Sequence, residues 1–281
     1  MSLTILWKGG SGMALLSIIV PCYNEEDAVE PFFARASAVC AGLGADVEYI
    51  FVDDGSQDGT LARIKELGAG VRWLSLSRNF GKEAAMFAGL EHARGDYVAV
   101  MDADLQDPPE LLPQLLAAAE SGQWDCAAVR RVDRKGEPPL RSWFARQFYK
   151  LINKMSRTEI VDGARDYRLM TRQMADAILR LTEYNRFSKG IFSWVGFRTK
   201  WVETENVRRA AGESKWSFFK LLLYALDGII AFSTAPLAIA SVLGLALCAV
   251  SFFAIIFVGL RKLVWGGSTF GGTSLVCMSL F

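Results

Sequence analysis

Short apolar runs alternate with longer amphipathic stretches along the first two thirds of the chain. The short runs are rich in β-branched residues, which is typical of buried strands. They lie near Leu16–Val20, Tyr49–Val52, Val71–Leu74, Tyr97–Met101 and Ala127–Val129. The longer stretches predict helices near Asp27–Cys40, Thr60–Leu67, Lys82–Ala93 and Glu110–Glu120. This alternation predicts an α/β fold with a parallel sheet that is covered by helices on both faces.

The pattern changes from Trp216 onward, where charged residues become rare and apolar residues run almost unbroken. We expect residues 211–234 to form an amphipathic juxtamembrane helix, because its polar positions fall on one narrow stripe. These positions are Ser217, Lys220, Tyr224 and Asp227. A helix of this kind is typical of the membrane interface.

Residues 235–281 are expected to form a transmembrane region. The stretch 236–260 has no charged residue and is longer than the ~20 residues that span a bilayer core. A second apolar run begins at Thr273 and is too short to cross a bilayer as a helix. It is either an interrupted second span or a surface segment. The chain is thus expected to be a multi-pass protein of the cell (inner) membrane, with a leader at 1–13 and a globular domain at 14–210.

Charge and cysteine usage argue against several classes of protein. The 281 residues include 31 Lys and Arg against 30 Asp and Glu, a net charge of +1, so no nucleic-acid partner is expected. The five cysteines lack CxxC spacing, which argues against a disulfide framework and a zinc site. The first apolar run is too short for a signal peptide. These features are typical of a cytoplasmic domain.

Three polar clusters directly follow predicted strands: Pro21–Glu25, Asp53–Ser56 and Asp102–Gln106. In open parallel sheets the ligand lies beyond the carboxyl ends of the strands. We therefore expect the three clusters to converge on one edge of the sheet and to form a single site.

Asp102 and Asp104 are separated by one residue and lie just past a strand. Gln106 adds a neutral oxygen two positions after Asp104. Hard oxygen ligands suit Mg²⁺ or Mn²⁺, which would bridge the carboxylates to a diphosphate. The alternative interpretation is a pair of loop acids that caps the helix beginning at Pro109.

The second cluster contains paired acids, Asp53 and Asp54, before Gly55, which permits a tight turn. An exposed carboxylate here would accept hydrogen bonds from a ribose or a base, and Tyr23 is placed to flank that base. Capping of the next helix is expected from Ser56 or Asp58. The only histidine, His92, is interpreted as a solvated surface residue, which argues against histidine-dependent nucleophilic catalysis.

Four segments, IIVPCYNEE, VDDGSQDGT, RNFGKEAAMFAGL and MDADLQDPPE, resemble glycosyltransferase family 2. More narrowly, they resemble its polyprenyl-phosphate members, the bactoprenol glucosyltransferases and dolichol-phosphate mannose synthases. The resemblance covers about residues 15–235. It implies a Rossmann-like GT-A catalytic domain, followed by an interfacial helix and C-terminal transmembrane helices. It also implies a nucleotide-sugar donor, a polyprenyl phosphate acceptor, and Mg²⁺ or Mn²⁺ as cofactor. A homo-oligomer is compatible with the resemblance.

The resemblance also implies roles for individual residues. It places the nucleotide-sugar against Pro21, Tyr23, Glu25, Asp54, Asp102, Ala103, Arg209 and Lys215. It places the metal on Asp102, Asp104 and Gln106, and the lipid phosphate on Arg130 and Arg141, with Ala145 where a serine is usual. Asp104, Asp166, Arg130 and Arg141 are the expected catalytic residues. On residue type alone, Asp166 fits an ion pair with Arg165 or Arg168 equally well, and Arg209 and Lys215 fit lipid headgroup anchors.

The expected function is inverting transfer of a hexose, with glucose from UDP-glucose as first choice, to undecaprenyl phosphate at the cytoplasmic membrane face. A phosphate monoester is largely dianionic at neutral pH, so no strong general base is required. The alternatives are mannose from GDP-mannose, another UDP-sugar, or non-catalytic binding of nucleotide-sugar or lipid. A processive polysaccharide synthase would need a QxxRW motif, which the sequence lacks. A dehydrogenase or P-loop enzyme would need a glycine-rich phosphate-binding motif after a strand, and the sequence lacks that motif as well.

Overall fold

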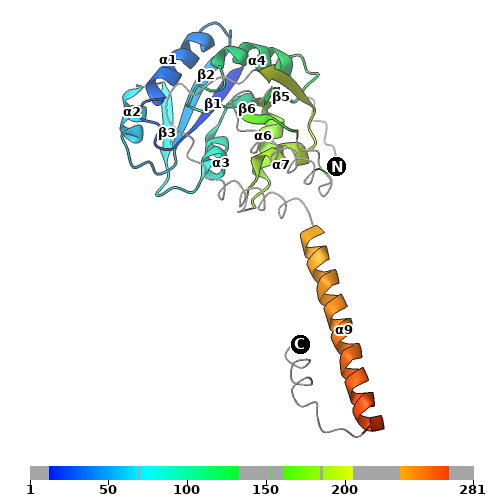
Figure 1. Ribbon diagram of the computed structural model, residues 1–281. Coiled ribbons are helices and arrows are strands. Elements are labelled where there is room, and N and C mark those ends of the chain that lie inside the picture. Colours follow the sequence, from blue (N-terminus) through cyan, green and yellow to red (C-terminus); the bar gives the residue numbers. More distant parts are fainter. Residues whose placement is uncertain are drawn as a thin grey trace. The chain divides into compact units, whose positions relative to one another are not determined.

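The computed structural model of the protein describes residues 13–68, 70–132, 153, 161–183, 186–204 and 235–265. The chain divides into two compact units, residues 1–231 and 232–281. The first unit contains a sheet with covering helices, and the second contains one long helix (Figure 1).

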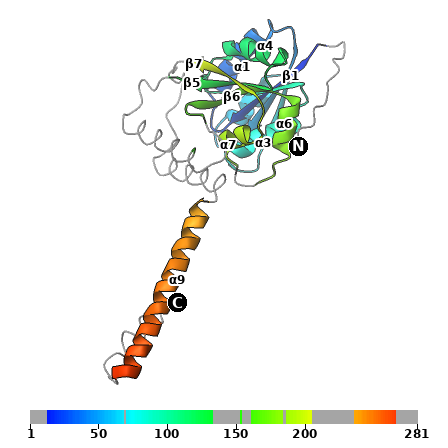
Figure 2. The ribbon, with the colours of Figure 1, turned by 90° about the vertical axis from the view of Figure 1, so that its right-hand side faces the viewer.

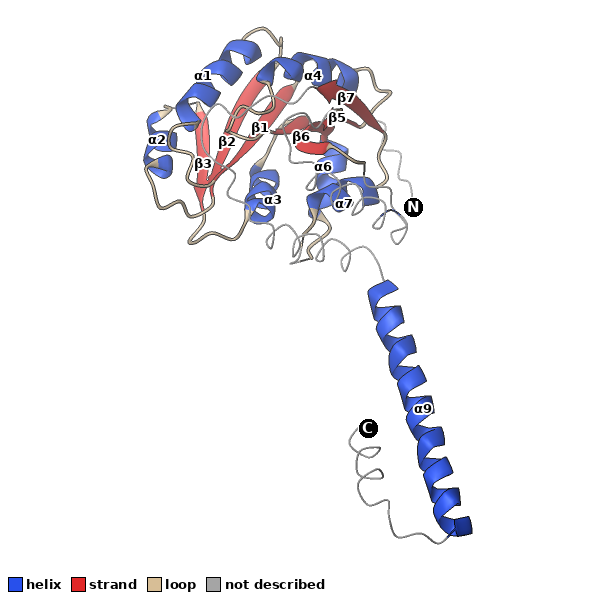
Figure 3. Cartoon of the chain, in the orientation of Figure 1, coloured by secondary structure: helices blue, strands red, loops and turns tan. Residues whose placement is uncertain are grey.

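The described part of the first unit contains one seven-stranded sheet, in the order β3-β2-β1-β4-β6-β5-β7 (Figure 3). The strands are β1 (Leu15–Cys22), β2 (Asp46–Asp53), β3 (Val71–Ser75), β4 (Tyr97–Val100), β5 (Cys126–Arg131), β6 (Ala164–Thr171) and β7 (Thr199–Thr204). Strands β3, β2, β1 and β4 are parallel neighbours. Strand β6 is antiparallel to both β4 and β5, and β5 is parallel to β7.

Helices cover both faces of this sheet. They are α1 (Val29–Cys40), α2 (Thr60–Glu66), α3 (Lys82–His92), α4 (Leu112–Glu120), α6 (Arg172–Leu179) and α7 (Ser188–Trp194), with the 3-10 turn η1 (Pro109–Leu111) before α4. Figures 1 and 2 show α1 and α4 over one face, and α3, α6 and α7 over the other. Pro109 opens η1, where its missing N–H is not needed.

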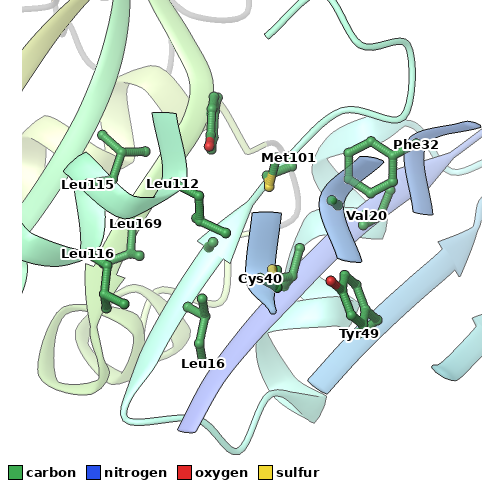
Figure 4. Packing of buried hydrophobic residues seen from close by; sticks show 14 of the residues in the cluster. Leu16, Val20, Phe32, Cys40, Tyr49, Met101, Leu112, Leu115, Leu116 and Leu169 are labelled. Atoms are coloured by element: carbon green, nitrogen blue, oxygen red, sulfur yellow. The ribbon is translucent and has the colours of Figure 1, made fainter. Parts of the chain in front are cut away.

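The main core lies between the sheet and the layer of α1 and α4 (Figure 4). The buried side chains of α1 recur three or four residues apart, as the helical period requires: Val29, Phe32, Ala36 and Cys40. In α4, Leu112, Leu115, Leu116 and Ala119 follow the same rule, and Ala118 is buried as well. They pack on strand residues such as Leu16 and Val20, which are fully buried. Burial of each large aliphatic side chain contributes about 1.5–3 kcal/mol.

All five predicted strands and all four predicted helices are present, with bounds that differ from the predictions by a few residues. The prediction of a parallel sheet is correct for β3, β2, β1 and β4 and wrong for the sheet as a whole, because β6 runs antiparallel between β4 and β5. The sequence of β6, ARDYRLMT, carries three charged residues and does not read as a buried strand. Its charges are compensated by residues distant in sequence, so the local pattern does not reveal the strand.

The second unit contains α9 (Ala235–Trp265) in its described part. Within the described residues, the segment Leu237–Arg261 is the one helix long and apolar enough to cross a membrane, with a mean hydropathy of 2.7. Its large apolar side chains are exposed; Leu245, for example, is 74% exposed. The predicted juxtamembrane helix at 211–234, the apolar run from Thr273, and the leader up to residue 12 lie outside the described residues.

Candidate active site

The carboxyl ends of β1, β2 and β4 meet at one edge of the sheet, as predicted from the three polar clusters. The parallel register pairs Cys22 with Asp53, and Ile19 with Val100, so the segments after these strands are neighbours. Strand β6 enters the same edge from the opposite direction. Its register pairs Arg168 with Val100, and Asp166 therefore lies where β4 continues into the Asp102 segment.

The Lys82 ammonium group joins the β4 and β6 segments at this edge. Its Nζ atom lies 2.7 Å from an oxygen of Asp102 and 2.6 Å from Oδ2 of Asp166. Lys82 is the first residue of α3, which follows β3 and the turn at Gly81. One cation thus bridges two carboxylates that are 18–25% exposed. The open interpretation of Asp166 as an ion-pair residue is correct in kind, but its partner is Lys82 instead of Arg165 or Arg168.

The three groups perturb one another's ionisation. Burial would raise the pKa of Asp166, but Lys82 and Lys189 hold it well below its usual range. Burial raises the pKa of Asp102, against the attraction of Lys82. Burial would lower the pKa of Lys82, yet Asp102 and Asp166 raise it well above its usual value. These shifts favour a charged ammonium group on Lys82 and an ionised carboxylate on Asp166 at neutral pH.

The turn after Asp102 arranges the other predicted metal ligands. The backbone N–H of Gln106 donates to Oδ1 of Asp104 at 3.1 Å. Leu105 between them has a φ of 55°, a left-handed conformation that is uncommon for leucine. The Gln106 side chain faces Arg165, whose Nη1 and Nη2 lie 3.3 and 3.4 Å from Oε1. Ala103, in the same turn, is buried in the core.

The next residue, Asp107, is 2% exposed and lies beside the same arginine, with Oδ1 3.2 Å from Nε of Arg165. Burial raises the pKa of Asp107 to about 6, against the attraction of Arg165. The alternative interpretation of this segment as a simple helix cap is not supported, because no side chain caps η1 or α4.

The donor set fits a hard divalent cation. Asp102, Asp104 and Gln106 offer two carboxylates and one amide oxygen. In this structure the Asp102 carboxylate contacts Lys82, and the amide oxygen of Gln106 accepts hydrogen bonds from Arg165. Among the described residues, no group of three or more His, Cys, Asp or Glu side chains is arranged to hold a metal. Mg²⁺ typically takes one or two carboxylates and completes its shell with substrate phosphates and water. The set is therefore suited to a metal that arrives with a diphosphate.

The acids after β2 are buried, so the expectation of an exposed carboxylate there is wrong. Asp53 and Asp54 are 1% and 2% exposed. Asp54 accepts the backbone N–H groups of Phe80 and Gly81 at 2.7 and 2.9 Å. Asp53 accepts the N–H of Ser56 at 3.1 Å. These acids fix the turn after β2 to the segment before α3, and that function is visible only in three dimensions.

Gly55 confirms the predicted tight turn, with a φ of 66°. A Cβ atom there would lie 2.4 Å from the backbone of Arg78. Ser56 does not cap α2, because its hydroxyl accepts the N–H of Asn24 at 3.0 Å. Asp58 lies before the first turn of α2 and accepts the N–H of Thr60 at 3.0 Å.

The β1 cluster lies beside this turn. Pro21, Tyr23 and Glu25 are half-buried, and the N–H of Glu25 donates to the hydroxyl of Thr60 at 2.7 Å. The site residues of the β1 and β2 clusters therefore form one connected surface. His92 lies away from this surface, at the end of α3, and is exposed as predicted.

Arg130 lies near the end of β5, next to a register shift between Ala128 and Arg130. Its guanidinium group forms an ion pair with Glu203 of β7, and the side chain is 38% exposed. Its predicted partner in the arginine pair, Arg141, lies outside the described residues, as do Ala145, Arg209 and Lys215. Their roles stay predictions.

Two residues of this site were missed in the sequence, Lys82 and Arg165. Lys82 stands in the NFGKEAA segment, at the start of the helix after β3. Because β3 is parallel to β2, the helix after β3 begins near the carboxyl ends of the strands, where the site lies. The position of Lys82 at the start of this helix could therefore have identified it. Arg165 lies in the unrecognised strand β6, and no local signal identifies it.

Comparisons with known proteins agree with this geometry. The profile of Glycosyl transferase family 2 matches residues 17–179. The chain belongs to glycosyltransferase family 2. It is 42% identical to the putative glycosyltransferase CsbB of Bacillus subtilis, with 95% of this chain and 82% of that protein covered. It is 40% identical to the bactoprenol glucosyl transferase of Shigella phage SfV, with 95% and 87% covered.

Two solved glycosyltransferase-like structures have a similar fold. The chain is similar to a mannosyltransferase from Pyrobaculum calidifontis in complex with GDP-Man and Mn²⁺, with a TM-score of 0.51, 17% identity, and 96% and 86% of the two chains covered. It is also similar to mannosyl-3-phosphoglycerate synthase from Rubrobacter xylanophilus, with a TM-score of 0.53, 19% identity, and 78% and 73% covered. The family 2 catalytic domain therefore has the GT-A fold predicted for it.

Proposed function

We propose that this family 2 protein transfers glucose from UDP-glucose to a polyprenyl phosphate at the membrane surface. The main structural support for this function is the group of acids in the β4 and β6 segments. There Lys82 bridges Asp102 and Asp166, and Asp104 lies in the same turn as Asp102. The substrates are supported by relatives at 39–40% identity over 95% of this chain that are described as bactoprenol glucosyl transferases.

The donor would bind across the edge formed by the β1, β2 and β4 clusters. Pro21, Tyr23 and Glu25 would contact the nucleoside, while Asp54 holds the adjoining turn through the N–H groups of Phe80 and Gly81. Asp102, Asp104 and Gln106 would hold Mg²⁺ or Mn²⁺. The metal, when bound, neutralises charge on the departing diphosphate. Arg209 and Lys215 are the proposed side chains for the same diphosphate.

The acceptor phosphate would attack the anomeric carbon directly. A bond forms between a phosphate oxygen and C1 of glucose, and the bond from C1 to the diphosphate oxygen breaks, so UDP leaves with the electron pair. No proton needs to move, because a phosphate monoester with a second pKa of about 6 is largely dianionic at neutral pH. Arg130, with Arg141, would align the phosphate for this attack.

Asp166 and Lys82 would set the charge of the site around the reacting sugar. The Asp166 carboxylate stays ionised beside Lys82, so it can accept hydrogen bonds from sugar hydroxyl groups. Lys82 can release Asp102 to the metal while it keeps Asp166, since it contacts both. Without the donor, Lys82 would be the counter-ion of both Asp102 and Asp166. With the donor bound, the metal would become the counter-ion of Asp102, and Lys82 would stay with Asp166.

The membrane assignment rests on α9 and on the relatives. The segment Leu237–Arg261 has the length and hydropathy of a membrane span. We propose that it anchors the protein in the cell membrane with the catalytic domain on the cytoplasmic side, where nucleotide-sugars are made. A lipid phosphate acceptor lies at the headgroup level, which explains why such an enzyme would need an anchor.

A donor panel tests the substrate assignment. The full chain in detergent would be incubated with undecaprenyl phosphate and Mn²⁺, and with radiolabelled UDP-glucose, UDP-N-acetylglucosamine or GDP-mannose. The extracted lipid would be counted for each sugar. We expect UDP-glucose to give the fastest labelling. Faster labelling from GDP-mannose would replace the donor, and no labelling from any nucleotide-sugar would favour the non-catalytic binding protein.

A further inference from the structure

Arg165 is a residue of the site to which the reaction proposed above assigns no role. Its guanidinium group lies against two consecutive residues of the turn after β4. Nη1 and Nη2 donate to Oε1 of Gln106, and Nε forms an ion pair with Asp107 at 3.2 Å. All three nitrogen atoms of one side chain therefore lie against one turn, two as hydrogen-bond donors and one in an ion pair.

This turn has a conformation that needs support. Leu105, immediately before the two contacted residues, has a φ of 55°. Non-glycine residues rarely adopt this left-handed conformation, because it costs free energy that the surroundings must offset. The same conformation brings the N–H of Gln106 to Oδ1 of Asp104 at 3.1 Å, which fixes one oxygen of that carboxylate. The orientation of Asp104 therefore depends on the strained residue.

Arg165 is itself firmly placed. Its backbone carbonyl accepts a hydrogen bond from Nη2 of Arg168 at 2.8 Å. Arg168 is 2% exposed and lies over the ring of Phe192, 3.5 Å from its centroid. The Arg165 side chain is 20% exposed, and its partner Asp107 only 2%. Arg165 thus connects strand β6 to the turn after β4.

We propose that Arg165 is a positioning residue that holds the turn of Asp104 to Asp107 in its strained conformation and so presents the Asp104 carboxylate to the metal. The inference rests on the proposed function for the role of Asp104 as a metal ligand. Asp107 compensates the charge of the guanidinium group, so that Arg165 can lie beside a cation site without repelling the cation. Partners that orient metal ligands typically change metal affinity by about 10–100-fold when they are removed.

The test compares Arg165→Met with a matched control, Arg172→Met. Arg172 follows the other end of β6 and also donates two hydrogen bonds, to the carbonyl of Gly95, but it lies at the opposite edge of the sheet. The dissociation constant of Mn²⁺ would be measured in the full chain by electron paramagnetic resonance, in the presence of UDP. We expect about a 10-fold or greater weakening for Arg165→Met. The control should stay within about 2-fold of the wild type.

A metal-free measurement keeps the inference separate from the proposed function. Amide hydrogen exchange at residues 104–107 should accelerate in Arg165→Met and not in Arg172→Met, without any metal or nucleotide. If wild-type protein binds no Mn²⁺, the proposed metal site fails, while the exchange result still tests Arg165. Unchanged exchange together with unchanged Mn²⁺ affinity would overturn the inference.

A second-site variant distinguishes local positioning from a general loss of stability. Glycine adopts positive φ without strain, so Leu105→Gly should restore part of the Mn²⁺ affinity when added to Arg165→Met. Arg165→Lys, which keeps the charge but offers a single nitrogen, should lie between the wild type and Arg165→Met. It also serves if Arg165→Met does not fold. No recovery with Leu105→Gly, or a wild-type affinity in Arg165→Lys, would contradict the inference.

Discussion

The acids at the end of β2 and the acids of the β4 and β6 segments lie on the same edge of one sheet, yet they have different kinds of partner. Asp53 and Asp54 are buried and accept hydrogen bonds from backbone N–H groups, which cannot move away. Asp102 and Asp166 contact the ammonium group of Lys82. This group lies at the end of a long side chain and is able to move away. The first pair fixes the shape of the edge. We propose that the second pair exchanges its counter-ion for a metal or a substrate.

The largest expected effect is on catalysis, at the β4 side. Asp102→Asn removes a proposed metal ligand while Lys82 keeps Asp166 as a partner. We expect the rate of sugar transfer to fall about 10³-fold, which corresponds to about 4 kcal/mol of transition-state stabilisation. Thermal unfolding, followed by circular dichroism, should change little. A decrease of less than about 10-fold would place the chemistry elsewhere.

The next effect tests whether the lysine acts as an exchangeable counter-ion. Lys82→Met should lower the transfer rate about 100-fold, because two carboxylates are left without their cation. It should also lower the melting temperature of the metal-free protein. Added Mn²⁺ should raise the melting temperature of Lys82→Met more than that of the wild type, since the metal replaces the missing charge. An equal response in both proteins would argue against exchange.

At the β2 side the expected effect is on stability. Asp54→Asn keeps the shape but replaces one acceptor oxygen with an N–H₂ group that faces a backbone donor. We expect the free energy of unfolding to fall by about 2 kcal/mol. Urea denaturation of the full chain in detergent would measure it. The KM for UDP-glucose in the same variant sharpens the comparison, because an unchanged KM would show that Asp54 is purely structural.

The smallest effect concerns the link between the first two clusters. Ser56→Ala removes the acceptor of the Asn24 N–H. We expect a loss of about 1 kcal/mol in the free energy of unfolding and a transfer rate close to that of the wild type. The same denaturation and transfer assays apply. A large loss of transfer with unchanged stability would mean that this side of the edge also takes part in catalysis.

The fold was predictable from sequence where strands and helices have uniform patterns. Leu16 to Val20 is an apolar run, and its strand was found. The strand β6 was missed because Arg165, Asp166 and Arg168 interrupt it. Each of these charges is compensated by a partner or ring distant in sequence, such as Lys82, Asp107 or Phe192. A pattern that is read locally cannot contain those partners.

The site was predictable to a similar degree, for a related reason. The convergence of three clusters follows from parallel strands, and it was found. The burial of Asp53 and Asp54 depends on the segment before α3, which brings the N–H groups of Phe80 and Gly81 to the end of β2. The role of Lys82 depends on an ion pair across 84 positions of sequence. Such long-range contacts require the folded chain.

The central claim is that the acids after β4 carry a metal-dependent transfer of sugar to lipid. The most direct test is the rate of glycolipid formation by Asp104→Asn, with Asp46→Asn as the control, since Asp46 is an exposed acid at the other end of β2. We predict that Asp104→Asn and chelator-treated wild-type protein form almost no labelled lipid, while Asp46→Asn keeps the wild-type rate and Mn²⁺ restores the chelated protein. A full rate in Asp104→Asn, or in the wild type with its metal chelated, would contradict the claim.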